Sequence, residues 1–476
     1  MIRAWAMGAA TGLALATLAG AATAPGAWAE EAKPRPATGK EADFMPEALA
    51  EVSDVKIPAI SLGDGVVGGK VRELVSPMGA GAHFSFRERR LFLLSGRGPT
   101  IPCARAEDFG TTVAALCAGD DKGRAYALPE FTPMIHEFLL TSAGGFKYEF
   151  SLPLRGAKGP VGALPNLPLT GFASETPYDA SGEKLKPDPS GIAPAAIARL
   201  PDQSFLIGDA NGPSLLHVAI DGEILDRYAP RGSAARFKGA DYPVRAVLPA
   251  ELARAGASGG ITAVGASPDG GYAYFAAAAP LGGKADARAL RIYRFNLPDR
   301  QPDGVWAYQL EPAIAFGAAA TQDQVRLVDM DALAGETLTL MAESDGRRLL
   351  VFAVTFEEGA RLSDAVASAS GNAAYESLDE AGLRKARLAP LKKTLVFDSA
   401  WAPGKLPPHV EGVAVLALNT LLVANLHDGG LGGDEDKPQV KLITLASPIV
   451  QRAAAAAGED GKIETGETPK EEPKKD

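Results

Sequence analysis

Short apolar runs, each ended by a turn, follow one another from Val66 to Leu445, and this pattern limits the possible folds more than any other feature of the chain. Runs such as HFSFRERRLFLLSGRGPT and YALPEFTPMIHEFLLTS are rich in aromatic and β-branched residues and end at Gly or Pro. No long amphipathic helix lies between these early runs, and the 53 Gly and 36 Pro suit a chain with many turns. We therefore expect an all-β fold.

The stretch Gly191–Tyr228 is typical of two hairpins placed end to end. One turn is predicted at Pro201-Asp202, and the pair Asp221-Gly222 separates the runs LLHVAI and EILDRY. Asp209–Pro213 lies between the two hairpins, in the kind of loop where all-β proteins often carry functional residues. A solvated turn is the alternative interpretation of this loop.

Four segments share a turn that leads into a short apolar strand, and they indicate a degenerate repeat. The turns lie at Asp202, Asp269, Asp345 and Asn419, at intervals of roughly 70 residues, longer than common propeller blades. A closed β-propeller hides the edges of its sheets by such repetition, so we expect one large propeller domain with insertions. A pair of β-sandwiches is the structural alternative. Asp364–Leu388 is the best predicted helix, as an insertion.

The two ends of the chain differ from the strand-rich part. Residues 1–29 combine Arg3, an apolar run and a small-residue cleavage site at Ala27-Trp28-Ala29, which predicts a signal peptide. We expect a flexible leader over 30–52, the propeller over 53–450 and a disordered charged tail over 451–476. The mature protein is then periplasmic or secreted, without a membrane span.

Charge and cysteine content restrict the partners. Lys and Arg number 48 against 58 Asp and Glu, which gives a net charge of -10 without a basic cluster, so no nucleic-acid partner is expected. The two cysteines, Cys103 and Cys117, are predicted to form a structural disulfide in an oxidising compartment. Histidine spacing gives no support for a zinc site, and no GxSxG motif marks a serine hydrolase.

Several segments, in the same order along the chain, resemble the bacterial phytase-like esterase family. They are SGRGPT, ALPEFTPMIHEFLL, SLPLRGAKGPVGALPN, GIAPAAIARLPDQSFLIGDANGPSLLHVAIDGEIL, GGITAVGASPDG, LTLMAESDGRR and HVEGVAVLALNTLLVANLHDGGL. The resemblance covers Val66 to Leu445 and implies an exported propeller distantly similar to calcium-dependent alkaline phytases.

Six positions depart from the acidic residues that the resemblance leads us to expect. They are Gly96, Ala193, Ala195, Ala210, Thr262 and Leu426. The carboxylates that remain are Asp209, Glu343, Glu411 and Asp428, which the resemblance implies as catalytic residues. Ca²⁺ prefers six to eight oxygen ligands, so its site, assigned to Asp209, Glu411 and Asp428, is weakened.

Arg97, Asn425 and His427 are the implied substrate-binding residues. Arg97 can hold a phosphate or carboxylate through its planar guanidinium, or form an ion pair with a neighbouring blade. For His427 a plain surface loop position is the alternative. The resemblance implies hydrolysis of phosphate or related esters with a divalent cation. A propeller without catalysis that binds a small anionic ester or an unknown envelope ligand is the second hypothesis.

Overall fold

The computed structural model describes residues 50–450 apart from 257–258, 283, 370–373, 379 and 434–435. These residues fall within one unit of the chain. The predicted signal peptide, the leader up to residue 49 and the tail after 450 lie outside the described residues. No helix in the described part is long and apolar enough to cross a membrane.

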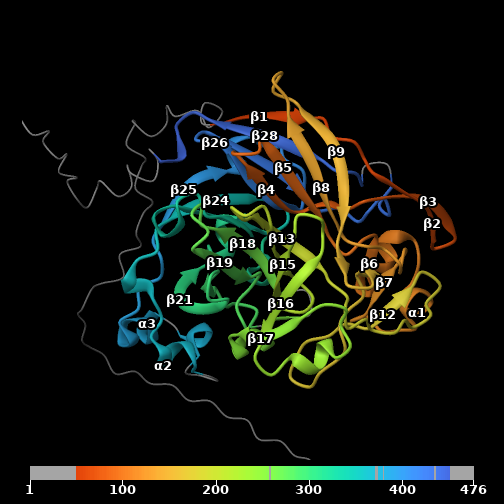
Figure 1. The fold of residues 1–476 in the computed structure, drawn as a ribbon, viewed down its shortest axis with the longest axis horizontal. Helices are drawn as coiled ribbons and strands as arrows, with labels where there is room; N and C mark the ends of the chain where they lie inside the picture. Colours follow the sequence, from red (N-terminus) through yellow and green to blue (C-terminus); the bar gives the residue numbers. More distant parts are fainter. Residues whose placement is uncertain are drawn as a thin grey trace, which may run out of the picture. The chain divides into compact units, whose positions relative to one another are not determined.

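Five sheets of four or more strands form the body of the described chain (Figure 1). The strands of each sheet are given in order, starting from the inner strand. The first sheet contains β4 (Met78–Ser85), β5 (Arg90–Ser95), β8 (Met134–Leu140) and β9 (Phe146–Pro153), and the second contains β13 (Pro194–Arg199), β14 (Phe205–Asp209), β15 (Ser214–Val218), β16 (Ile224–Pro230) and β17 (Val244–Leu248). The third contains β18 (Ile261–Ala266), β19 (Tyr272–Ala277), β20 (Ala289–Asn296) and β21 (Gln301–Gln309), the fourth β22 (Arg326–Asp331), β23 (Thr339–Ser344), β24 (Leu349–Val354) and β25 (Lys393–Asp398), and the fifth β26 (Val410–Ala417), β27 (Thr420–Asn425), β28 (Val440–Leu445) and β1 (Ala50–Val55). Neighbouring strands are antiparallel except β16 and β17, which are parallel.

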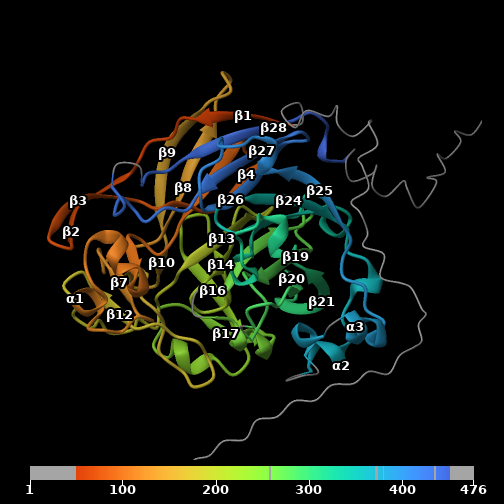
Figure 2. The same cartoon turned by 180° about the vertical axis from the view of Figure 1, so that it is seen from behind.

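The five sheets are arranged in a ring, which confirms the expected β-propeller. Strand β4 contacts β13, β13 contacts β18, β18 contacts β22, β22 contacts β26, and β26 contacts β4 again. Between each sheet and the next lies one cluster of buried apolar side chains, so the core is divided among five interfaces. The N-terminal strand β1 pairs with β28 and completes the last sheet, so segments from the two ends of the described chain close the ring (Figure 2).

Small residues allow the inner strands to approach one another closely. A Cβ atom on Gly81 of β4 would lie 2.9 Å from the Cα of Ala196 in β13, and one on Gly265 of β18 would lie 2.8 Å from the backbone nitrogen of Ala332. Both distances are shorter than carbon and nitrogen atoms tolerate. The alanine and glycine in these strands are therefore required by the convergence of the blades on one axis.

A smaller group of elements lies beside the ring. It contains the hairpin of β2 (Ser61–Val67) and β3 (Lys70–Val75), a three-stranded sheet of β6 (Thr100–Pro102), β7 (Arg124–Tyr126) and β12 (Pro177–Asp179), and helix α1 (Val113–Cys117). A disulfide joins Cys103 to Cys117 across this group, with their Cα atoms 6.0 Å apart, and both cysteines lie in its apolar core. The short pair β10 (Arg155–Gly156) and β11 (Gly159–Pro160) follows β9.

The hairpins predicted over Gly191–Tyr228 are present as β13–β14 and β15–β16. The single helix expected over Asp364–Leu388 is wrong, because the described residues there contain α2 (Asp364–Ala367), one 3-10 turn and α3 (Glu380–Ala386). Their apolar side chains, among them Tyr375 of the 3-10 turn, pack against Ala289 of β20 and Ala307 of β21, and this packing holds several short turns in place.

The four predicted repeat turns are not all equivalent. Those at Asp202, Asp269 and Asn419 join the inner strand of a sheet to its second strand. Asp345 instead joins the second strand, β23, to the third, β24, and the corresponding loop in that sheet is the one around Gly335. The motif of Asp and Gly therefore marks a tight turn at either end of a blade, and not one fixed place in the repeat.

Candidate functional site

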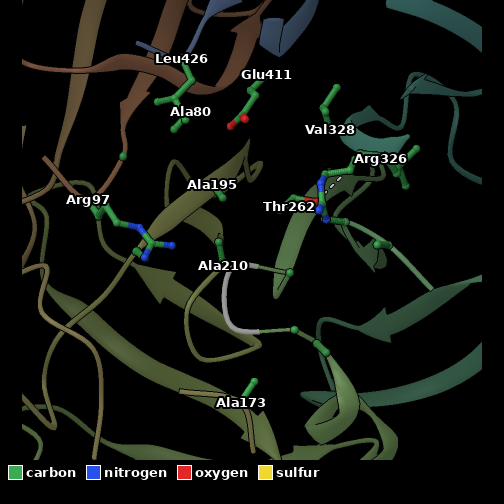
Figure 3. A pocket seen from close by; sticks show the side chains of 18 of the residues that line it. Ala80, Arg97, Ala173, Ala195, Ala210, Thr262, Arg326, Val328, Glu411 and Leu426 are labelled. Carbon is green, nitrogen blue, oxygen red and sulfur yellow. Dashed lines mark hydrogen bonds between the residues drawn. The ribbon is translucent and has the colours of Figure 1, made fainter. Parts of the chain in front are cut away.

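A pocket of about 1070 Å³ opens where the inner strands of the five sheets begin (Figure 3). All five inner strands, β4, β13, β18, β22 and β26, contribute lining residues, together with the loops that follow β5, β14, β19 and β27. A pocket of this size at a convergence of strands is the usual location of a ligand site.

A β-bulge at the start of each inner strand directs one residue of that strand to the pocket. The pairing of the inner strand with the second strand is interrupted between Met78 and Ala82, and at four corresponding places in the other sheets. The residues at these interruptions that line the pocket are Ala80, Ala195, Thr262, Val328 and Glu411. Bulges commonly re-aim side chains beside functional sites. Of the five residues in this ring, which we call the bulge ring, Glu411 alone is acidic.

The six positions at which acidic residues were expected all line this pocket. Ala195 and Thr262 belong to the bulge ring, and Ala193 directly precedes β13. Gly96, Ala210 and Leu426 each directly follow the second strand of their sheet. The six positions are scattered in the sequence, but the fold brings them to one place, where none of their side chains offers a carboxylate.

Glu411 points into the pocket between Arg97 and Arg326 in the view of Figure 3. Its carboxylate makes no hydrogen bond or ion pair with another described residue. Burial in the pocket raises the pKa of Glu411 to about 7, although the positive charges of Arg326 and Arg97 act in the opposite direction. At neutral pH this carboxyl group therefore exists in both protonation states, as an acid–base group requires.

Arginines contribute most of the positive charge of the pocket. Arg97 and Arg124 both line it and share one buried carboxylate, Glu175; the Nε of Arg124 lies 3.1 Å from this carboxylate. Arg326, at the first position of β22, donates a hydrogen bond from Nη2 to the backbone oxygen of Asp323 at 3.4 Å. Within the described part of the chain Arg326 forms no ion pair with an acidic residue.

His427 and Asp428 also lie in the pocket wall, in the loop after β27. The Nδ1 of His427 accepts a hydrogen bond from the backbone N–H of Gly429 at 3.2 Å, while its buried Nε2 has no partner among the described residues. Burial lowers the pKa of His427 to about 4, so the ring is neutral at pH 7. Asp428 lies 3.5 Å from a guanidinium nitrogen of Arg105.

The structure does not bring Asp209 to the pocket. Its side chain is fully buried and forms an ion pair with the equally buried Arg227. The other carboxylate oxygen accepts hydrogen bonds from the backbone N–H groups of Asn211 at 2.8 Å, Gly212 at 3.2 Å and Ala193 at 3.3 Å. Asp209 thus fixes the loop after β14, which presents Ala210 to the pocket, and also the backbone of Ala193 just before β13.

Glu343 and Asn425 are likewise engaged inside the protein and do not line the pocket. Glu343 is fully buried and accepts hydrogen bonds from the hydroxyl of Tyr308 at 2.5 Å, the Nζ of Lys393 at 2.8 Å and the backbone of Glu311. The side chain of Asn425 accepts a bond from the backbone N–H of Gln439 at 2.6 Å. Of the predicted site residues, the fold therefore gathers Arg97, Glu411, His427 and Asp428.

The family described as phytase-like, with esterase-like activity of phytase, matches residues 153–425. This match covers more than half of the chain. The protein belongs to the phytase-like family. A search of curated proteins finds no match for this phytase-like chain.

Solved structures that resemble this phytase-like protein do so distantly. A luciferin-regenerating enzyme is 12% identical with a TM-score of 0.33, covering 83% of this chain and 95% of its own. Aldose sugar dehydrogenase from Streptomyces coelicolor with bound PQQ is 10% identical with a TM-score of 0.30, covering 83% of this chain and 98% of its own. Virginiamycin B lyase from Staphylococcus aureus is 8% identical with a TM-score of 0.29, covering 83% and 99%. These values carry no argument about the site.

The donor set of the pocket does not fit a calcium ion. Three acidic residues line it, namely Asp323, Glu411 and Asp428, and Asp428 already has Arg105 as a partner. Among the described residues no group of three or more His, Cys, Asp or Glu side chains is placed to hold a metal. Ca²⁺ needs six to eight oxygen ligands, several of them carboxylates, and two guanidinium groups beside Glu411 oppose a further positive charge.

Sequence reasoning missed the complete bulge ring and Arg326. Ala80 and Val328 are ordinary strand residues, and only their position one or two residues into an inner strand distinguishes them. Arg326 stands directly before the apolar start of β22, where a single cation carries no recognisable motif. Its importance follows from the contacts between β22 and the strands on either side of it.

Proposed function

We propose that this phytase-like propeller is an exported protein of the cell envelope that binds a small-molecule ligand in its central pocket, without cation-assisted hydrolysis of a phosphate ester. The composition of the bulge ring carries this proposal. Four of its five members, Ala80, Ala195, Thr262 and Val328, offer no carboxylate, so the pocket keeps its shape while most of the groups that would bind a cation or relay protons are missing.

Export is part of the proposal and rests on the sequence. Arg3, the apolar run after it and the small residues before Glu30 favour removal of residues 1–29, and the periplasm or the medium is then the place where the ligand is met. Mass spectrometry of the protein secreted by its host would give a chain that begins at Glu30. A mature protein that retains Met1 would contradict export.

Hydrolysis assays on the purified mature protein test the absence of turnover. Phytate, p-nitrophenyl phosphate and p-nitrophenyl acetate are offered with millimolar calcium and with a chelator. We expect no calcium-dependent product from any of them, and no calcium-dependent rise in the unfolding midpoint, because the residues that the structure describes offer no cluster of metal ligands that would favour the folded state. Turnover that needs calcium and is lost in Glu411→Gln and Asp428→Asn would overturn the proposal.

Metal-independent ester hydrolysis is the second candidate, and the state of Glu411 favours it. A carboxyl group with a pKa of about 7 can take a proton from an attacking water, and Arg97 and Arg326, which line the same pocket, are cations of the kind that stabilise developing negative charge. Activity on p-nitrophenyl acetate in chelator that disappears in Glu411→Gln, with an unchanged fold, would favour this candidate over simple binding.

A further inference from the structure

Three arginine residues in the described part of the chain are at most 2% exposed, and one of them lacks an acidic partner. Arg227 forms an ion pair with the equally buried Asp209. Arg291 forms an ion pair with Glu376. Arg236 is 1% exposed, yet it forms no ion pair with any residue that the structure describes. A buried charge without a partner is unfavourable in the folded state, so Arg236 differs from the other two in being able to gain from an anion.

One side of the Arg236 guanidinium is unoccupied. Arg236 lies in the 3-10 turn Ala234–Phe237, and its Nη1 donates a hydrogen bond to the backbone oxygen of Ala173 at 3.2 Å. Its Nε and Nη2 have no partner among the described residues. These two nitrogens form the side of a guanidinium that can donate two parallel hydrogen bonds to one carboxylate. Arg199 uses the same side in this way, with Nε and Nη2 lying 3.0 and 2.8 Å from the two carboxylate oxygens of Glu88.

The charges around Arg236 do not compensate it. Burial and the nearby charge of Arg227 lower the pKa of Arg236, while Asp209 acts in the opposite direction. Asp209 is already held by its ion pair with Arg227, and so it leaves the second guanidinium without a carboxylate. The ring of Phe172, whose centroid lies 5.4 Å from the Cζ of Arg236, supplies a cation–π contact in place of an anion.

Arg236 lies directly behind the pocket wall. Phe172 and Ala173, which it contacts, both line the pocket (Figure 3). They belong to residues 171–175, which we call the wall segment, and this segment is fixed at its far end by the ion pair of Glu175 with Arg97. From Ala173 to Glu175 its backbone N–H groups make no hydrogen bond to another described residue. Few bonds therefore oppose a local shift of the wall segment.

We propose that Arg236 is an anion-binding group of the central pocket, and that a shift of the wall segment lets its Nε and Nη2 hold the carboxylate of a ligand. This inference rests on the proposed function, since it names a group that binds the ligand of the same pocket. One side of one guanidinium makes both hydrogen bonds, so neither a metal nor a second arginine is required. Arg326 also lacks an ion pair, but it is exposed, and water and salt weaken its attraction for an anion.

Calorimetric titration of the mature protein in a chelating buffer at pH 7 and constant ionic strength tests this inference. Acetate is the anionic probe, and acetamide is its neutral counterpart of nearly the same shape. We expect acetate to bind at least tenfold more tightly than acetamide, because only acetate compensates the buried charge. Arg236→Met should weaken acetate binding at least tenfold, and Arg236→Lys, which keeps the charge but loses the planar group, should restore part of the affinity.

Two further variants separate binding from a structural role. Arg231→Met, at an exposed position five residues before Arg236, is the matched control and should bind acetate as the parent does. Phe172→Ala removes the ring that covers the guanidinium and should tighten acetate binding. Arg236→Met should unfold at a temperature no lower than the parent, because it removes a buried charge that the described residues leave unpaired.

The outcomes distinguish this inference from the proposed function. Equal affinity for acetate and acetamide, no binding of acetate, or an unchanged acetate affinity in Arg236→Met would overturn the role of Arg236. A fall in the unfolding midpoint of Arg236→Met as large as that of Arg227→Met would also overturn it, because Arg236 would then be compensated within the protein. Weaker acetate binding in Phe172→Ala would contradict the covering role of the wall segment. Calcium-dependent ester turnover would instead refute the proposed function, whether or not Arg236 binds acetate.

Discussion

Replacing Glu411 by glutamine should stabilise the protein at alkaline pH and leave its stability unchanged at acidic pH. The pKa of Glu411 is raised to about 7, from an ordinary value of 4.5, because the carboxylate is buried in the pocket. Between these two values the folded protein binds more protons at this side chain than the unfolded chain does. Stability therefore falls as the pH rises from 4.5 to 7, and the full cost is present above pH 7.

The size of the effect follows from the difference between the two pKa values. At about 1.36 kcal/mol for each pH unit, this difference corresponds to roughly 3 kcal/mol in the free energy of unfolding. Glutamine has nearly the same shape and cannot ionise. The variant should therefore be more stable than the parent by up to roughly 3 kcal/mol at pH 8, and by less than about 0.5 kcal/mol at pH 4.

Urea unfolding of both proteins at pH 4, 6 and 8 measures this difference. Other buried carboxylates titrate in both proteins, including Asp331, whose pKa burial raises to about 7, so their contribution cancels in the comparison. Glu357→Gln replaces an exposed side chain and is the matched control, which should change the free energy of unfolding by less than about 0.5 kcal/mol. If Glu411→Gln changes the free energy of unfolding equally at pH 4 and pH 8, the assignment of a raised pKa to this side chain is refuted.

Three further predictions concern the scaffold that shapes the pocket. Arg227→Met leaves the buried carboxylate of Asp209 without its ion-pair partner and should lower the free energy of unfolding, measured in urea, by about 3–5 kcal/mol. Arg87→Met, at an exposed site, should have little effect. A loss below about 1 kcal/mol in Arg227→Met would contradict the structural role of Asp209. Gly81→Ala places a Cβ 2.9 Å from the backbone of Ala196 and should lower the free energy of unfolding by about 1–3 kcal/mol. Gly359→Ala, whose Cβ would have no atom within 4 Å, is the control. Equal effects of the two substitutions would mean that β4 and β13 are not closely packed. Replacing both Cys103 and Cys117 by alanine removes a disulfide between residues 14 apart in sequence and should cost about 2–4 kcal/mol relative to the oxidised parent. A variant as stable as the oxidised parent would show that the disulfide does not hold this group together.

The strands and hairpins could be predicted from the sequence because their signals are local. The pair Asp221-Gly222 supplies a residue that tolerates positive φ, and Gly222 has a φ of 86° in the turn between β15 and β16. The broken helix after Asp364 could not be predicted, because its short turns are held by packing on Ala289 and Ala307, which belong to β20 and β21.

The family resemblance located the acidic residues in sequence but could not say which of them share a pocket. The resemblance implies Asp209 and Glu343 as catalytic residues, but both carboxylates lie in the interior with partners that compensate their charge. Burial and pairing depend on Arg227 and Lys393, which are 18 and 50 residues away along the chain. Such long-range partners leave no local pattern in the sequence.

The sequence by itself determined the fold class, the family and the absence of acidic residues at six positions. Tertiary structure alone decided that these positions meet, because five inner strands, each with a bulge at its start, converge on one axis. Convergence also brings Arg97 and Arg326 to opposite sides of Glu411, although β5 and β22 are far apart in the chain. The character of the pocket therefore arises from packing between blades, while each blade is specified by its own strands and turns.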